Sequence, residues 1–299
     1  MKPHDNLSDS RGNRLGISVF LFMLHVMGVN RTCEFVWAIA LFYTLFDARA
    51  CRAASHYLKR RFPGASRLAM FYHTWALFTG QGQALVETRA MGLGKLKWRF
   101  ENKGAPEELI RGKAGFILLA SHFSCWQALI GGLDDMKRPV NLLVTPDVNM
   151  NVDKFIAADA LHVKIKVIST LSGMGGLVEA SDALARGEVV CMMGDRSFEE
   201  QGARVPFLGE DALFPYAAFY LAARNSCAVL PLFAVPERRH TDFVVHYGNV
   251  IRPQLSGRRR SDLLPYVRCY AEKLESMAKA YPYRCFLFED IWNVRQGLR

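Results

Sequence analysis

The segment Gly115–Gln127, which reads GFILLASHFSCWQ, decides the fold class, because an apolar run ends there and delivers His122 where a helix is expected to begin. The run Phe116–Ala120 has the composition of a buried strand. Further short β-rich runs follow, with helix-like stretches between them, at 140–145, 163–168, 189–193 and 228–235. This alternation predicts an α/β fold with a mixed, largely parallel central sheet flanked by helices.

The segments that connect these strands indicate where functional residues are expected to lie. Helices are expected up to Leu133 and over 152–160, 177–185 and 214–224, and a long loop after 189–193. The segment 62–99 is also expected to be helical, because its large apolar residues recur at helical spacing. In parallel sheets, functional residues gather where the strands end at their carboxyl edge. The loops after 116–120 and 189–193 carry the most reactive side chains.

Composition narrows the class of protein. With 299 residues and 51% apolar content, the chain is neither disordered nor a small disulfide scaffold. Its 38 Lys and Arg exceed 28 Asp and Glu, a net charge of +10 that favours an anionic membrane, an acidic carrier protein or nucleic acid as partner. The cysteines number seven and lack a C-x-x-C pair, which indicates reduced and mostly buried thiols in a cytosol-facing protein.

Two apolar runs, Leu15–Asn30 and Phe35–Phe46, dominate the N-terminal region. Each is shorter than the roughly 20 residues that span a bilayer. Joined as one helix they would suffice to cross, with Arg31 and Glu34 paired on one face, whereas a turn at 28–30 would give a hairpin in one leaflet. A third alternative is a helical pair buried against the core. We expect 1–60 to be a membrane-associated helical region and 61–299 the α/β domain.

Basic residues flank the two apolar runs on both sides. They form a collar suited to anionic headgroups, made of Arg11, Arg14, Arg49, Arg52, Lys59, Arg60 and Arg61. Nucleic acid is not expected as a partner, because no RNA- or DNA-binding motif accompanies the basic run 257–260.

Several motifs occur in the order found in one enzyme family. The elements are SHFSCWQ, MGDRS at 193–197, VPFLGE at 205–210, VLPLFAVPE at 229–237 and GQGQALVETRAMGL at 80–93. Residues 13–64 add an RLG opening and a closing pattern of Ser55, Tyr57, Leu58, Arg60, Phe62 and Pro63. Together they resemble the lipid A late (lauroyl/myristoyl-type) acyltransferases of the lysophospholipid acyltransferase superfamily over nearly the whole chain.

The resemblance implies a general base and a partner for it. In that family an H-x4-[DE] motif supplies the base and the acid, which implies His122 as the base. The family's acid is replaced here by Gln127. An amide oxygen can accept a ring N–H and fix the histidine tautomer, but it brings no negative charge. Three outcomes stay open: a slower enzyme, an enzyme that recruits another carboxylate such as Asp195, or a lipid-binding protein without turnover.

The loop after 189–193 supplies the other half of the expected site. Asp195, Arg196 and Arg204 are the predicted substrate-binding residues, because arginine can hold a phosphate or an oxyanion with two hydrogen bonds. The alternative for each arginine is an ion pair that only orders the loop. No metal-binding motif is present, and the resemblance implies neither a metal nor any other cofactor.

The resemblance completes the expected function. It implies a membrane-associated O-acyltransferase that moves a fatty acyl group from acyl carrier protein or coenzyme A to a hydroxyl of a lipid A-like or other glycolipid acceptor. The expected location is the bacterial cell inner membrane, with the catalytic domain on the cytoplasmic side. The competing hypothesis is a catalytically weakened lipid-binding or complex-forming homologue.

Overall fold

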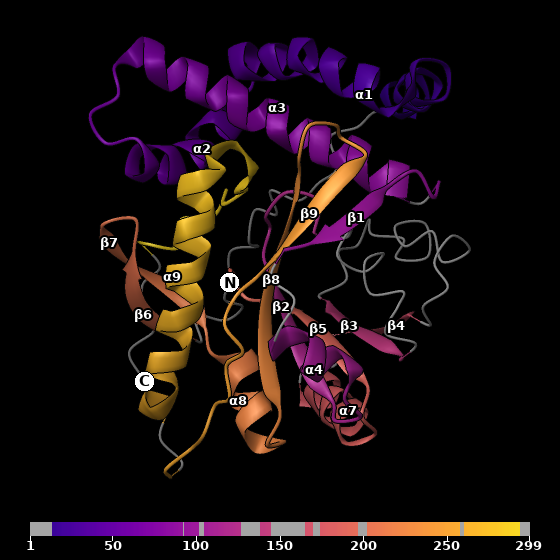
Figure 1. The fold of residues 1–299 in the computed structure, drawn as a ribbon. Helices are drawn as coiled ribbons and strands as arrows, with labels where there is room; N and C mark the ends of the chain where they lie inside the picture. The colour runs from indigo at the N-terminus through magenta and orange to yellow at the C-terminus, as the bar shows by residue number, and fades with distance from the viewer. Residues whose placement is uncertain are drawn as a thin grey trace.

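A mixed, largely parallel sheet forms the centre of the molecule (Figure 1). The computed structural model describes residues 14–91, 93–101, 105–126, 138–144, 165–169, 174–196, 202–257 and 260–293. In these ranges a seven-stranded sheet has the order β1-β9-β8-β2-β5-β3-β4. The strands are β1 (Lys97–Phe100), β2 (Phe116–Ala120), β3 (Val140–Val144), β4 (Ile165–Ser169), β5 (Val189–Met193), β8 (Ala228–Pro236) and β9 (Asp242–Tyr247). Neighbouring strands are parallel except β8 and β9, so the mixed, largely parallel sheet is confirmed.

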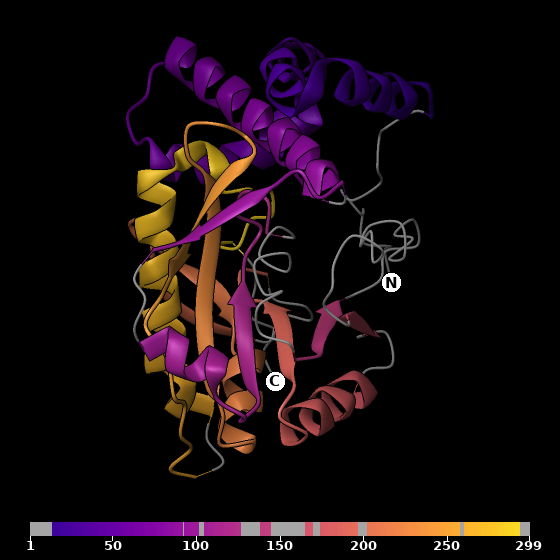
Figure 2. The same cartoon turned by 45° about the vertical axis from the view of Figure 1, so that its right-hand side comes forward.

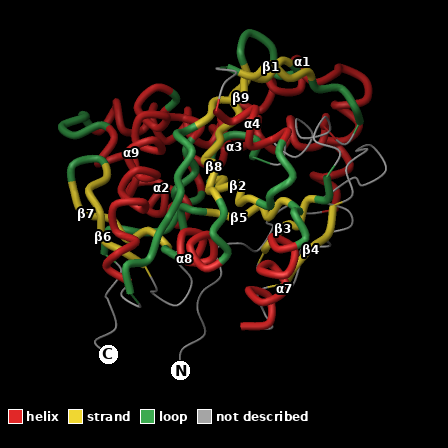
Figure 3. The backbone as a smooth tube through the Cα atoms, turned by 60° about the horizontal axis from the view of Figure 1, so that its bottom comes forward, coloured by secondary structure: helices red, strands yellow, loops and turns green. Residues whose placement is uncertain are grey.

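Helices cover the sheet on several sides. Three of them, α1 (Arg14–Phe46), α2 (Ala48–Arg61) and α3 (Arg67–Met91), form a layer above it (Figures 1 and 2). The five parallel strands β2, β3, β4, β5 and β8 point toward this layer in Figure 2, so their carboxyl ends face it, whereas β9 and its neighbour β1 run the opposite way. The other helices are α4 (Ala105–Arg111), α7 (Met174–Ala185), α8 (Ala217–Arg224) and α9 (Leu264–Ala280), with 3-10 turns η4 (Arg260–Leu263) and η5 (Pro282–Arg284). Helices α7 and α8 lie at the opposite end of the strands (Figure 3).

The central strands are continuous apolar runs because both of their faces are buried. Every residue of β2 and β3 is buried, as are the first four of β5 and the first eight of β8. A strand covered on both faces does not alternate apolar with polar residues. This is why the sequence alone located β2 and β5 at the bounds observed.

The N-terminal apolar region bends at Gly28. Its backbone has φ 76° and ψ 174°, which divides α1 into two helical parts. A residue with a Cβ adopts such a positive φ at a cost, whereas glycine does so readily. The structure therefore has a bend at Gly28 and not one straight helix. Arg31 and Glu34 do pair, at 3.2 Å. Among the described residues, no helix has the length and apolar content to cross a membrane.

Helix α1 is neither wholly buried nor wholly free. One face packs on α3 through the buried side chains of Leu24, Val29, Cys33 and Val36. Other large apolar side chains of α1 are exposed, including Phe22, Val26, Phe35, Trp37, Phe42 and Phe46, although the Trp37 ring also contacts Trp75 of α3. The expectation of a helical pair buried against the core is thus met on one face only.

The basic collar is smaller than the sequence suggested. The Arg60 guanidinium donates two hydrogen bonds to Glu210, at 3.0 and 2.7 Å, and lies 4.3 Å from the ring centroid of Trp292. The guanidinium of Arg61 donates to the main-chain carbonyls of Ala278 and Lys279. Both arginines therefore attach α2 to the domain, so the expectation that they face headgroups is corrected.

Three further expectations require correction. Residues Lys97–Phe100 form an edge strand and not the end of a helix. The expected long loop after β5 contains the antiparallel hairpin of β6 (Gly202–Phe207) and β7 (Glu210–Pro215). Its two-residue turn has φ 53° at Leu208 and φ 88° at Gly209, the positive angles that tight hairpins need. Residues 121–126 are not helical, and the helices expected at 127–133 and 152–160 lie outside the described residues.

Candidate active site

The candidate site lies where β2 and β5 end side by side. The two strands are parallel neighbours, and their register places Ala120 opposite Met193. The N–H of Gly194 donates to the carbonyl of Ala120 at 2.8 Å, which holds the two departing chains together. Because parallel strands end at the same edge, His122 and Asp195 emerge next to each other.

His122 and Asp195 form a closely hydrogen-bonded pair. Nδ1 of His122 is 3.1 Å from both carboxylate oxygens of Asp195. The main-chain N–H of His122 also donates to Oδ2 of Asp195, at 2.7 Å. One carboxylate thus fixes both the backbone and the ring of the histidine. Asp195, the carboxylate named as a possible replacement for the family's acid, is therefore in contact with His122.

The Asp195 carboxylate is ionised although it is buried. Its side chain is 1% exposed, against 29% for His122. Burial opposes ionisation, but the charge and hydrogen bonds of His122 and the charge of Arg196 outweigh it and hold the pKa of Asp195 below its usual value. The buried anion favours the tautomer in which Nδ1 carries the proton and stabilises an imidazolium ion. Nε2, on the opposite side of the ring, then keeps its lone pair and can act as a base.

A neighbouring thiol does not compete as the reactive group. Burial, and secondarily the charge of Asp195, raises the pKa of the Cys285 thiol well above its usual value. A protonated thiol is a poor nucleophile. The histidine, 29% exposed, is therefore better suited to chemistry at this edge of the sheet than this thiol.

Segments distant in sequence support the loop that carries His122. The Tyr270 hydroxyl of α9 donates to the Ala120 carbonyl at 2.9 Å. On the other side, the N–H of Phe286 donates to the carbonyl of His122 at 2.8 Å, and the N–H of Ser124 donates to the carbonyl of Arg284 at 2.6 Å. These supporting residues were not predicted from the sequence, because main-chain pairing with a C-terminal segment leaves no local pattern.

The remaining predicted site residues have different positions. Nη1 of Arg196 is 3.3 Å from Oε1 of Glu289, while its buried Nε has no hydrogen-bond partner among the residues described. Arg204 lies on the β6–β7 hairpin, and its Nη1 donates to the carbonyls of Trp292 and Asp211 at 3.0 and 3.4 Å. These bonds tie the hairpin to the C-terminal segment, which is the ordering role expected as the alternative. Gln127 lies outside the described residues.

Fold and site together describe an α/β protein with a histidine–carboxylate pair at the carboxyl edge of its sheet, an arrangement suited to deprotonating a hydroxyl during group transfer. The family of bacterial lipid A biosynthesis acyltransferases matches residues 12–293, and the chain belongs to this family. It is accordingly a lipid acyltransferase.

Comparison with other proteins adds little to this assignment. A solved structure, the 1-acyl-sn-glycerophosphate (LPA) acyltransferase PlsC from Thermotoga maritima, is similar with a TM-score of 0.38 and 16% identity. The similarity covers 82% of this chain and 97% of that one. No curated protein matched the chain.

Proposed function

We propose that this acyltransferase moves a fatty acyl group from acyl carrier protein or coenzyme A to a hydroxyl of a lipid A-like or other glycolipid acceptor. The observation that carries the proposal is the contact between His122 and Asp195, with Nδ1 3.1 Å from both carboxylate oxygens. In this assignment His122 is the general base. Asp195 supplies the negative charge that Gln127 lacks, so the missing acid of the family motif is no reason to assign an inactive homologue.

The reaction would proceed by attack of the acceptor hydroxyl on the donor thioester. Nε2 of His122 takes the hydroxyl proton as the oxygen forms a bond to the thioester carbonyl carbon, giving a tetrahedral oxyanion. The C–S bond then breaks, and the departing thiolate recovers the proton from the imidazolium. Asp195 stabilises the imidazolium between these two steps. The thioester is already activated, so the transfer needs no cofactor.

Arg196 is the described side chain best suited to assist with charge. It adjoins Asp195 in sequence, and its buried Nε has no hydrogen-bond partner among the described residues. A guanidinium with a free N–H can stabilise the developing oxyanion or a phosphate of either substrate. Glu289 holds one end of the guanidinium and limits its movement.

The exposed apolar face of α1 and α3 supports membrane association. Its side chains are large, with Phe42 59%, Phe46 71% and Leu68 80% exposed, and the rings of Phe42 and Phe46 are in contact. Exposed apolar patches of this kind mark interaction sites, and burying their large apolar side chains in a lipid bilayer removes them from water. We place the protein on the cytoplasmic side of the bacterial inner membrane, where the net charge of +10 also favours anionic lipid and an acidic carrier protein.

The decisive experiment incubates purified protein with labelled acyl donor and membrane lipid acceptors. Transfer that His122→Ala and Asp195→Asn each abolish or reduce about 100-fold or more would support the enzyme and its pair. No transfer with either acyl carrier protein or coenzyme A thioesters, over a panel of hydroxylated glycolipids, would leave the lipid-binding homologue.

A further inference from the structure

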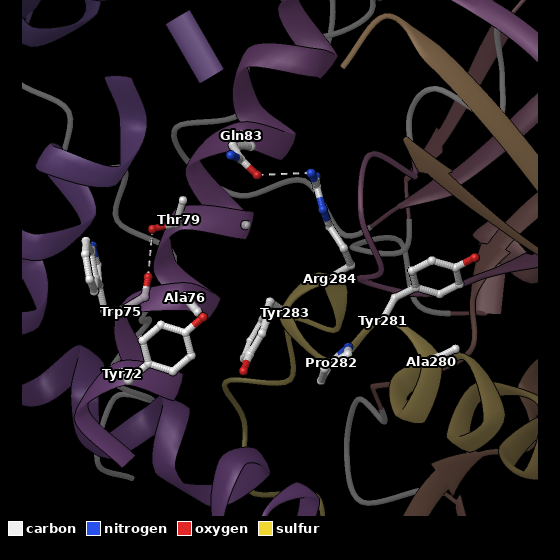
Figure 4. Close-up of a pocket in the computed structure, with 11 residues that line it drawn as sticks. Tyr72, Trp75, Ala76, Thr79, Gln83, Ala280, Tyr281, Pro282, Tyr283 and Arg284 are labelled. Carbon is white, nitrogen blue, oxygen red and sulfur yellow. Dashed lines mark hydrogen bonds between the residues drawn. The ribbon is translucent and has the colours of Figure 1, made fainter. Parts of the chain in front are cut away.

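The structure buries a charged cluster that the proposed reaction does not use. Glu87 of α3 is fully buried, and its carboxylate oxygens accept hydrogen bonds from Nη1 of Arg284 at 3.0 and 2.9 Å. Nδ1 of His240, between β8 and β9, lies 2.7 Å from Glu87. Nη2 of Arg284 donates to Oε1 of Gln83 at 3.1 Å (Figure 4). Burying a carboxylate is costly unless it is fully paired, and this one is.

Arg284 joins this cluster to the candidate active site. Its side chain is bound to α3, while its main chain pairs with the loop that carries His122. The Arg284 carbonyl accepts the N–H of Ser124 at 2.6 Å, and two residues further the N–H of Phe286 donates to the carbonyl of His122. A bridge between Phe123 and Cys285 completes a short antiparallel ladder. A displacement of Arg284 would therefore move the backbone of His122.

The backbone of the loop needs such support. Ser124 has φ 50°, a left-handed conformation that a serine adopts only when its surroundings impose it. The ladder holds the loop through the carbonyl of His122 and the N–H of Ser124, and the Asp195 carboxylate holds it through the N–H of His122. Loss of the ladder would leave Asp195 as the main restraint on the position of the imidazole.

A metal site is the alternative use of this cluster. Cys33, Glu87 and His240 place possible ligand atoms within 4.8 Å of one another. Arg284, however, puts its positive charge on both oxygens of Glu87, where a cation would have to bind. Burial, and next the charge of Glu87, raises the pKa of the Cys33 thiol far above its usual value, so it is not a ready thiolate ligand. The contacts favour a structural ion pair.

We infer that the Glu87–Arg284 ion pair is a positioning device for His122, fixing the 122–124 loop so that the imidazole meets Asp195. This inference rests on the proposed role of His122 as the base. It assigns Arg284 and Glu87 as positioning residues, since neither touches the His122 ring. Helix α3 also carries part of the exposed apolar face, so the same contact links the proposed membrane-binding layer to the site.

The test removes both charges at once. A single substitution leaves a buried charge without its partner and can unfold the protein. Replacing both partners with apolar residues of similar size is often neutral for stability. The variant is Glu87→Leu/Arg284→Met, and its control is Arg268→Gln/Glu272→Gln, which removes an exposed ion pair at 3.1 Å on the surface of α9. Measurements are kcat and KM for acyl transfer, the melting temperature, and amide hydrogen exchange of residues 122–124 and 284–286.

The expected result is faster exchange in both segments, by about tenfold or more, while exchange in β2 is unchanged. The value of kcat should fall about 10- to 100-fold with KM for the donor nearly constant, because a small displacement of a base lowers the rate of the chemical step. A folded double variant with unchanged exchange and kcat would overturn the inference, as would a kcat that falls only in proportion to lost stability.

If the wild-type protein transfers no acyl group, the proposed function fails, and hydrogen exchange alone decides whether the ion pair holds the loop. A rise in the melting temperature of the wild-type protein on addition of zinc would instead support the metal site.

Discussion

The carboxylate of Asp195 meets Nδ1 of His122 at 3.1 Å and also accepts its main-chain N–H at 2.7 Å. The two residues lie 73 positions apart in the chain and come together because β2 and β5 are parallel neighbours. A single buried anion therefore sets the tautomer, the ring orientation and the backbone of the proposed base.

Substitution of Asp195 with Asn should lower kcat while leaving the protein folded. The amide keeps the volume and can still accept one hydrogen bond, but it cannot stabilise an imidazolium by charge. We expect a fall of about 10² to 10⁴ in kcat, by analogy with a histidine-bound Asp in other enzymes. Steady-state kinetics with a saturating donor measures it. Activity within twofold of wild type would exclude Asp195 as the partner.

Gln127→Glu should maintain or raise activity if residue 127 occupies the position of the family's acid. A second carboxylate would add negative charge beside the imidazole, whereas Asp195 already provides one. The same assay compares the single variant with Gln127→Glu/Asp195→Asn, in which the new carboxylate should recover part of the lost kcat. Complete loss of activity in the single variant would show that the pocket is built around a neutral amide.

The contribution of Asp195 to stability should depend on pH. Because its pKa is lowered in the folded state, the stabilisation is fully present above the unfolded value of about 3.9 and is lost as pH falls through the folded pKa. The difference in free energy of unfolding between wild type and Asp195→Asn should therefore be constant from pH 7 to about pH 5 and shrink below pH 4. Urea titrations across this range measure it. A difference that grows on acidification would contradict the lowered pKa.

Gly194→Ala should destabilise the protein and displace the loop of Asp195. A Cβ at this position would lie 2.7 Å from Cζ of Tyr270 and 2.9 Å from Cδ1 of Leu119. Tyr270 is fully buried, so relief requires movement of packed atoms, at about 1–3 kcal/mol. Thermal melts should show a lower melting temperature. Gly257→Ala is the control, since nothing lies within 4 Å of its added Cβ.

Phe42→Asp/Phe46→Asp should weaken binding to anionic lipid vesicles without unfolding the protein. These rings lie in contact, with centroids 4.9 Å apart, and are 59% and 71% exposed. Each buried phenyl ring contributes about 1.5–3 kcal/mol, so the loss should exceed about tenfold in vesicle affinity. Co-sedimentation measures it. Val178→Asp on α7, 57% exposed and outside the face, is the control; equal effects of the two variants would contradict a specific membrane face.

Part of the fold can be predicted from the sequence, because strands buried on both faces are continuous apolar runs. The bounds of β2 and β5 agree with the apolar runs, and β8 differs by one residue. The edge strand β1 was not predicted, because its residues are alternately exposed and half-buried and it forms only by pairing with β9. The β6–β7 hairpin was missed for a related reason, since its strands are stabilised by packing on α9 and by each other.

The residues that support the candidate site could not be predicted from the sequence. Glu87 and Arg284 stand 197 residues apart, and each taken alone resembles an ordinary surface charge on a helix or turn. Their pairing is a property of how α3 lies over the C-terminal segment. The same holds for Tyr270, whose hydroxyl reaches Ala120 from α9.

The sequence by itself determined the α/β class, and it predicted the two loops of the candidate site and His122 as the proposed base. These features depend on local composition and on the apolar runs that both faces of a parallel sheet require. Only the tertiary structure decided that Asp195 pairs with His122, since no local spacing joins residues from different strands. The pairing follows from the hydrogen-bond register of β2 and β5, which places Ala120 opposite Met193. His122 and the buried carboxylate of Asp195 therefore lie within hydrogen-bond distance.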